Sequence, residues 1–92
     1  MNESPQISIV IPVKNESGNI DNLIKEIDIA LSKFKYEIIY VDDGSTDNTP
    51  FELKNNLKIN KRLRVLSHKS SLGQSAALRS GISLSKSPLI AT

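Results

Sequence analysis

Short apolar runs rich in β-branched residues alternate along this chain with segments whose apolar residues recur at helical spacing. Such an alternation, with short connections, favours a parallel sheet joined by right-handed crossovers. The sequence therefore predicts a three-layer, Rossmann-like α/β fold of the order βαβαβαβ, with strands in the spatial order three-two-one-four. The strands are expected at residues 7–12, 36–41, 63–67 and 88–92, and the helices at 19–33, 50–58 and 75–85.

The expected helices carry patterns that say how each should pack. The first has one apolar face made by residues at helical spacing, namely Ile20, Leu23, Ile24, Ile27 and Leu31. In the second, Thr49 and Glu52 match a capping box, and Leu53 and Leu57 are expected to face the sheet. In the third, Gly81 and nearby alanines allow a close approach to the sheet.

The composition limits the possible classes of protein. With 92 residues, 38% of them apolar and 24% charged, the chain is at most one globular domain. The net charge of +2 is small and the lysines are scattered without interleaved aromatic residues, so we expect no nucleic-acid partner. The absence of cysteine excludes disulfides and thiolate metal sites. No signal peptide and no apolar run long enough for a transmembrane helix is visible, so a cytoplasmic location is expected.

Two adjacent carboxylates, Asp42 and Asp43, stand where the second expected strand ends. Ligands of open parallel sheets bind beyond the carboxyl ends of the strands, and carboxylates there can accept hydrogen bonds from a base and a ribose. The alternative is a polar turn in which such side chains only cap and shape the backbone, which is the role expected for Asp47. An EF-hand does not fit the spacing, and in a receiver domain the acidic pair closes the first strand instead.

The loop after the first strand contains Pro12, Asn15 and Glu16. It lacks the glycine pattern of dinucleotide-binding folds, having only Gly18, and the Walker pattern is absent as well. Asn15 and Glu16 can either hold the loop through bonds to backbone groups or offer hydrogen-bond partners to a base and ribose. The residues alone leave both roles open.

The loop after the third strand leads through Gly73 into the last helix. Backbone N–H groups at that helix start could hold a phosphate, with Arg79 one turn inside the helix as a charge partner. Arg79 could equally be a solvated residue of the outer helix face. His68, at the start of the loop, is expected to be a surface residue rather than a base or a ligand.

Taken together, these motifs resemble the N-terminal half of the family-two inverting glycosyltransferases of GT-A fold. The resemblance runs from about Ile7 to Thr92 and is nearest to the polyprenyl-phosphate sugar transferases, such as dolichol-phosphate mannose synthase. It implies that Pro12, Asn15, Glu16 and the Asp42-Asp43 pair hold the base and ribose of a nucleotide sugar, with Gly73 in the following loop and Arg79 near the diphosphate. One departure is Ser71, where the family commonly has asparagine.

A larger departure is the family's D-x-D motif, whose carboxylates coordinate Mg²⁺ or Mn²⁺ and which is expected beyond Thr92. The resemblance therefore implies a single partial domain over residues 1–92, without metal ligands or catalytic groups of its own and inactive alone. The implied substrates are a UDP- or GDP-type sugar donor and a lipid-phosphate or saccharide acceptor, which could place the full-length protein at the cytoplasmic membrane face. Self-association through the last strand's free edge is also expected. The alternative is a short, non-catalytic nucleotide-binding or regulatory module.

Overall fold

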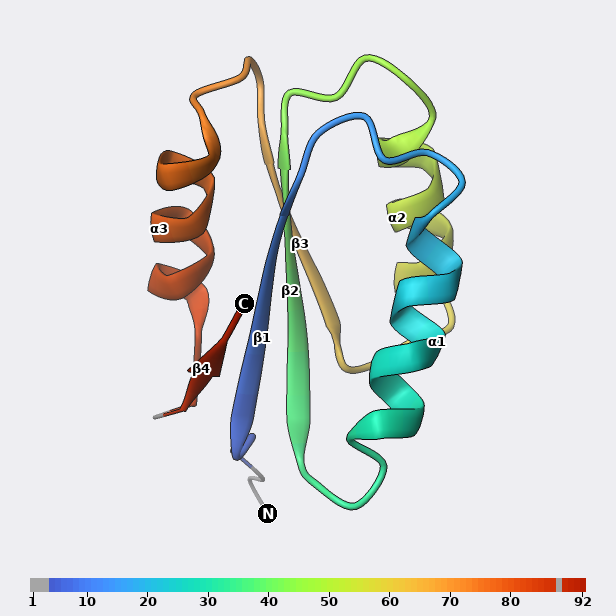
Figure 1. Cartoon of the computed structure of the whole chain (residues 1–92), viewed down its shortest axis with the longest axis vertical. Coiled ribbons are helices and arrows are strands. Elements are labelled where there is room, and N and C mark those ends of the chain that lie inside the picture. Colours follow the sequence, from blue (N-terminus) through green and yellow to red (C-terminus); the bar gives the residue numbers. More distant parts are fainter. Residues whose placement is uncertain (1–3, 88) are drawn as a thin grey trace.

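The computed structural model describes residues 4–87 and 89–92, and within them strands and helices alternate as the sequence predicts (Figure 1). The strands are β1 (Ile7–Val13), β2 (Tyr36–Asp43), β3 (Leu63–His68) and β4 (Ile90–Ala91). The helices are α1 (Ile20–Ala30), α2 (Thr49–Leu57) and α3 (Gln74–Leu84). The predicted order βαβαβαβ is confirmed.

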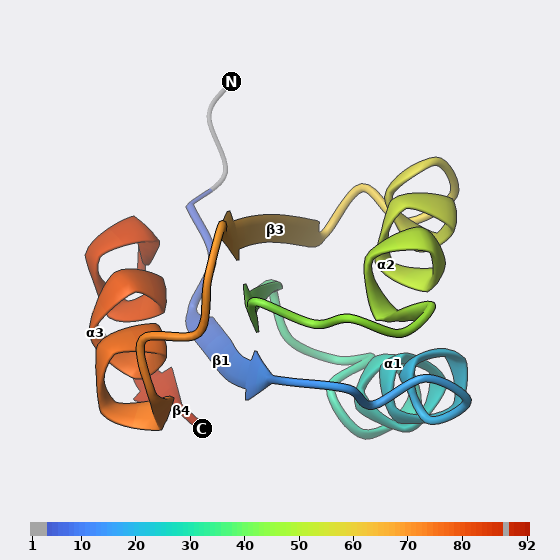
Figure 2. The ribbon, with the colours of Figure 1, turned by 90° about the horizontal axis from the view of Figure 1, so that it is seen from above.

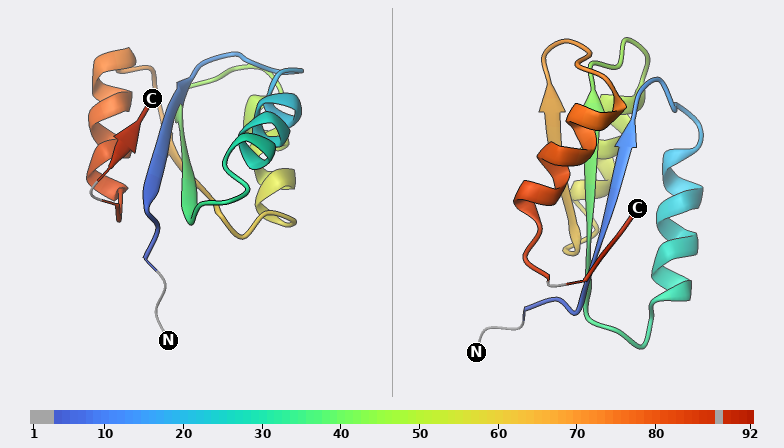
Figure 3. Two further views of the ribbon diagram at one scale, coloured as in Figure 1. Left: turned by 60° about the horizontal axis from the view of Figure 1, so that its bottom comes forward. Right: turned by 60° about the vertical axis from the view of Figure 1, so that its left-hand side comes forward.

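The sheet is wholly parallel and has the order β3-β2-β1-β4, as predicted. β1 and β2 pair over their length, from Ile7 opposite Tyr36 to Val13 opposite Asp42. α1 and α2 cover one face of the sheet and α3 covers the other, which gives three layers when the molecule is seen from above (Figure 2). The loops that follow β1, β2 and β3 all emerge at one end of the sheet (Figure 3).

β2 is buried along its whole length because both of its faces are covered. Since successive side chains of a strand point to opposite faces, Ile38 and Tyr40 belong to the core under α1 and α2, whereas Ile39 and Val41 belong to the core under α3. α3 lies close to the sheet at Gly81, where an added Cβ would collide with Val10. The predicted close approach of this helix is therefore confirmed.

Several details of the helices differ from the sequence prediction. α1 ends at Ala30 and Leu31 is its C-cap residue, but the Leu31 side chain still packs against the core as predicted, whereas Leu23 of the predicted apolar face is 38% exposed. Leu57 lies at the end of α2 and is 42% exposed, whereas Leu53 is buried as predicted. The position beside Leu53 is taken by Asn56, whose Nδ2 donates to the backbone oxygen of Glu52, 2.9 Å away. An amide that finds acceptors inside the fold can replace an apolar residue there.

The predicted capping box of α2 is also wrong. Thr49 lies inside the helix and Asn48 occupies the N-cap position without a side-chain bond. The Thr49 and Glu52 side chains bond instead to the loop that follows β1. The predicted fourth strand is reduced to Ile90–Ala91, and Pro88 lies outside the described residues.

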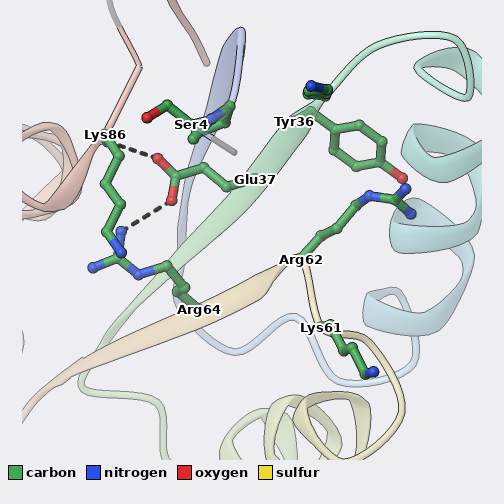
Figure 4. A pocket seen from close by; sticks show the side chains of 9 residues that line it. Ser4, Tyr36, Glu37, Lys61, Arg62, Arg64 and Lys86 are labelled. Carbon is green, nitrogen blue, oxygen red and sulfur yellow. Dashed lines mark hydrogen bonds and ion pairs between the residues drawn. The ribbon is translucent and has the colours of Figure 1, made fainter. Parts of the chain in front are cut away.

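The opposite end of the sheet is fastened by the buried carboxylate of Glu37 on β2 (Figure 4). Its Oε2 accepts from the Ser8 hydroxyl at 2.6 Å and from the Lys86 N–H at 2.7 Å, and its Oε1 accepts from Arg64 at 2.9 Å. Burial by itself raises the pKa of Glu37, but these three donors outweigh it and hold the pKa below its ordinary value. This network ties the segment after α3 to the sheet.

Candidate functional site

The carboxyl ends of β1 and β2 and the loops after β1 and β3 surround a cavity of about 400 Å³. Its lining consists of Pro12, Val13, Lys14, Glu16, Asp43, Ser71, Gly73 and Gln74. The structure thus brings together Pro12, Glu16, Asp43 and Gly73, which the sequence analysis selected from three separate loops. Asn15, Asp42 and Arg79 were selected too, but they do not line this cavity.

Asp43 is the most heavily bonded side chain of the site. Its Oδ1 accepts from the Leu72 N–H and from His68 Nδ1, both at 2.8 Å, and its Oδ2 accepts from the Gly73 N–H and the Ser71 hydroxyl, both at 2.9 Å. The Leu72 N–H, followed by His68, holds the pKa of Asp43 far below its ordinary value, against the opposing effect of burial. Asp43 is therefore an ionised carboxylate that fixes the loop leading into α3.

Asp42 has a different environment although it is the neighbouring residue. It is buried, and its Oδ1 accepts from the Ser45 N–H at 3.0 Å, which shapes the turn after β2. Gly44 in this turn has a φ of +74°, and a Cβ added there would lie 2.6 Å from the backbone nitrogen of Ser71. The turn that Asp42 shapes therefore lies close against the backbone of the loop before α3.

Asn15 joins the loop after β1 to the turn after β2. Its N–H donates to the Ser45 hydroxyl at 2.9 Å, and its Oδ1 accepts from the Thr46 N–H at 2.8 Å. Its backbone has a φ of +56°, a conformation that asparagine tolerates better than most residues. These bonds correspond to the loop-holding role that the sequence left open for Asn15.

The neighbouring backbone groups are held by side chains from the segment that includes α2. The Glu16 N–H donates to Thr49 Oγ1 at 2.9 Å, the Ser17 N–H to Asp47 Oδ2 at 3.1 Å, and the Gly18 N–H to Glu52 Oε1 at 3.0 Å. The expectation that Asp47 shapes a turn is confirmed, since its Oδ1 also accepts from the Thr49 N–H at 2.9 Å. The capping box is absent because the side chains of Thr49 and Glu52 bond to a loop more than 30 residues away.

Glu16 and Arg79 are both exposed, but only Glu16 borders the cavity. The Glu16 carboxylate accepts from the side-chain amide of Asn19 at 3.3 Å, a long bond that leaves most of its acceptor capacity unused. Arg79 lies in α3, and its backbone oxygen accepts from Ser83. Its expected place near a diphosphate stays a prediction.

The sequence analysis misjudged His68. The side chain is only 11% exposed and bonds to Asp43 through Nδ1 and to the Ser80 hydroxyl through Nε2, at 2.8 and 3.0 Å. Its position directly opposite Asp43 on the neighbouring strand could have signalled this contact, but only once the register was known. Ser71, at the position where the family commonly has asparagine, contributes its hydroxyl to the same carboxylate.

The hydroxyl of Tyr40, a core residue of β2, has no hydrogen-bond partner among the described residues. The whole side chain is buried. Burial, and then the charge of Glu16, raises the pKa of Tyr40 to about 12, so the hydroxyl is neutral. An unpaired buried hydroxyl costs free energy, so Tyr40 is a point of weakness in the core.

A metal site is not built from the part of the chain that the structure describes, because no three His, Asp or Glu side chains there are grouped to hold an ion. The residues therefore do not fit a divalent cation by themselves.

None of the helices that the structure describes is long and apolar enough to span a bilayer.

Comparison with known proteins identifies the family. The model of the glycosyl transferase family 2 domain matches residues 8–92. The chain belongs to glycosyl transferase family 2. Among curated relatives in this family, the dodecaprenyl-phosphate galacturonate synthase of Rhizobium johnstonii is 32% identical over 93 residues, which cover 98% of this chain and 28% of that protein. The dolichol-phosphate mannosyltransferase of Pyrococcus furiosus is 36% identical over 76 residues, covering 83% of this chain and 21% of that protein.

Solved structures show the same fold for this family 2 chain. The mannosyltransferase PcManGT of Pyrobaculum calidifontis, solved in complex with GDP-Man and Mn²⁺, aligns with a TM-score of 0.73 at 23% identity, over 89% of this chain and 25% of that one. TarS of S. aureus aligns with a TM-score of 0.76 at 19% identity, over 92% of this chain and 26% of that one. The predicted GT-A-like α/β fold is thus confirmed. The chain spans about a quarter of the length of the relatives it matches.

Proposed function

We propose that this family 2 chain forms the nucleoside-binding part of a glycosyltransferase that transfers a sugar from a UDP- or GDP-type donor to a polyprenyl-phosphate or saccharide acceptor. The observation that carries the proposal is the cavity lined by Pro12, Glu16, Asp43 and Gly73, at the carboxyl end of a parallel sheet. In this proposal residues 1–92 are one partial domain of a longer enzyme, acting in the cytoplasm or at the cytoplasmic face of a membrane.

Several of the residues selected from the sequence can be given a role in nucleotide recognition. Glu16 has free acceptor positions toward the cavity and suits ribose hydroxyls. Asp43 already accepts four protein donors, so a base N–H would share a carboxylate oxygen with one of them. Pro12 supplies a rigid apolar wall, and Asn15 and Asp42 hold the loops that frame the cavity. Arg79 is proposed to approach the diphosphate.

The proposed whole enzyme uses Mg²⁺ or Mn²⁺ at the donor diphosphate, but the described residues offer no ligand set for it. We therefore derive no catalytic step from these residues. Nucleoside recognition by this chain is expected to be independent of divalent cations, and the chain alone is expected to show no transfer and no donor hydrolysis. Metal-dependent turnover by the purified chain would mean that catalytic groups lie among these residues.

The direct test is an NMR titration of the chain with UDP and with GDP, each with and without Mg²⁺. We expect saturable shifts of the Val13 and Gly73 amides with at least one nucleotide, equal in both conditions. Glu16→Gln should weaken binding about threefold to tenfold by loss of charge-assisted hydrogen bonds. Glu26→Gln, an exposed change of the same charge on α1, serves as the control. Shifts that do not saturate at millimolar concentrations of either nucleotide would refute the proposal.

A further inference from the structure

We infer that His68 is a positioning residue of the nucleotide site: its Nδ1–H holds the Asp43 carboxylate in the orientation that fixes the Leu72 and Gly73 amides at the cavity wall. The expected effect of His68 on nucleotide affinity rests on the proposed function. The direction of the hydrogen bond between His68 and Asp43 does not depend on a nucleotide, so it can be tested in the free protein.

The hydrogen-bond partners determine the tautomer of the ring. An ionised carboxylate only accepts hydrogen bonds, so the nitrogen 2.8 Å from Asp43 Oδ1 has to carry the proton. Nε2 lies 3.0 Å from the Ser80 hydroxyl, which can donate to a neutral ring or accept from a protonated one. The bond to Asp43 therefore persists in both protonation states, which suits a structural support better than a proton-transfer group.

The location of His68 explains why this bond matters. His68 ends β3 and stands opposite Asp43, the last residue of β2, while Ser80 belongs to α3. The ring thus joins two strands and the helix that follows the loop. The other donors to Asp43 come from residues 71–73 in the loop before α3, whereas His68 belongs to β3 of the sheet. Among the residues that the structure describes, His68 is the one donor to Asp43 that does not belong to the loop being held.

Two substitutions separate the two ends of the ring. His68→Asn keeps a donor near the position of Nδ1 and loses the contact with Ser80. His68→Gln places its amide near the position of Nε2 and loses the donor to Asp43. We expect His68→Asn to retain the affinity for UDP or GDP within about twofold. His68→Gln should lower this affinity about tenfold, because it loses one hydrogen bond to a charged group. Ser80→Ala should resemble His68→Asn.

Two measurements on the free protein make the test independent of nucleotide binding. Nitrogen NMR of the imidazole should show Nδ1 protonated in the wild type. Amide exchange at Leu72 and Gly73, whose N–H groups donate to Asp43, should be faster in His68→Gln than in His68→Asn and Ser80→Ala.

A ring protonated only on Nε2, or equal amide exchange in His68→Asn and His68→Gln, would overturn the inference. A wild type that binds neither nucleotide refutes the proposed function, while the tautomer and the amide exchange still decide the role of His68. If a variant fails to fold, the tautomer of the wild type remains decisive.

Discussion

Gly44→Ala should destabilise the protein more than any other glycine substitution in its loops, because two costs combine there. The φ of +74° places the new side chain in the left-handed region, at a cost of about 1–2 kcal/mol. The added Cβ would also lie 2.6 Å from the Ser71 nitrogen and 2.8 Å from the Ser70 carbonyl carbon, and both atoms are backbone. Forcing backbone segments apart costs about 1–3 kcal/mol more, which gives about 2–5 kcal/mol in all.

Gly18→Ala provides a matched control. Gly18 has a φ of +92°, but nothing lies within 4 Å of the Cβ it would gain, so only the conformational cost applies. Urea unfolding followed by circular dichroism, with an unchanged m-value, measures both variants on one scale. Gly44→Ala should be less stable than Gly18→Ala by about 1–3 kcal/mol. Equal losses in the two variants would show that the turn after β2 does not press against the loop before α3.

Three further predictions concern other parts of the chain. Tyr40→Phe removes a buried hydroxyl that has no partner among the described residues, so it should raise the free energy of unfolding by about 1 kcal/mol; a loss of that size in urea unfolding would mean that the hydroxyl is bonded. The pKa of Glu37 lies below its ordinary value of 4.5, so its contribution to stability is complete above pH 4.5 and is lost as the pH falls through the lower folded value. Acid unfolding should therefore be shallower in Glu37→Gln, and curves of equal slope for the two proteins would contradict this. β4 pairs with β1 on one side only in the described sheet, so the 92-residue chain is expected to self-associate through that edge at high concentration; light scattering that shows a monomer at every concentration would disprove it.

The order of the elements was predictable because periodicity is a local property of the sequence. The short run Ile38–Val41 places apolar side chains on both faces of its strand, which favours a sheet covered on both sides. In a parallel sheet, the loops after β1, β2 and β3 all emerge at the same end of the sheet. The family resemblance assigned Pro12, Glu16, Asp43 and Gly73 to one site at this end, and the structure gathers them around one cavity.

The partners of the polar side chains could not be predicted in the same way. Thr49 and Glu52 fit a capping box equally well by local spacing, yet they bond to backbone groups 33 and 34 residues away. Asp43 was predicted to accept hydrogen bonds from a base or a ribose, but its protein partners were not foreseen: the register of β2 and β3 sets His68 beside it, and the loop after β3 donates to it. Whether a donor reaches a carboxylate depends on differences of a few tenths of an ångström in the spacing of segments that are far apart in the sequence.

The sequence by itself therefore determined the layers, the strand order and the edge of the sheet where the candidate site lies, since these follow from burial patterns and chain connectivity. Only the tertiary structure decided that Asp42 and Asn15 hold loops, that Leu57 is exposed and that His68 is bonded on both sides of its ring. Apolar burial is non-directional and tolerates small shifts, so a pattern suffices to predict it. Hydrogen bonds are directional and short-ranged, and their partners are settled only when the packed elements bring donors and acceptors together.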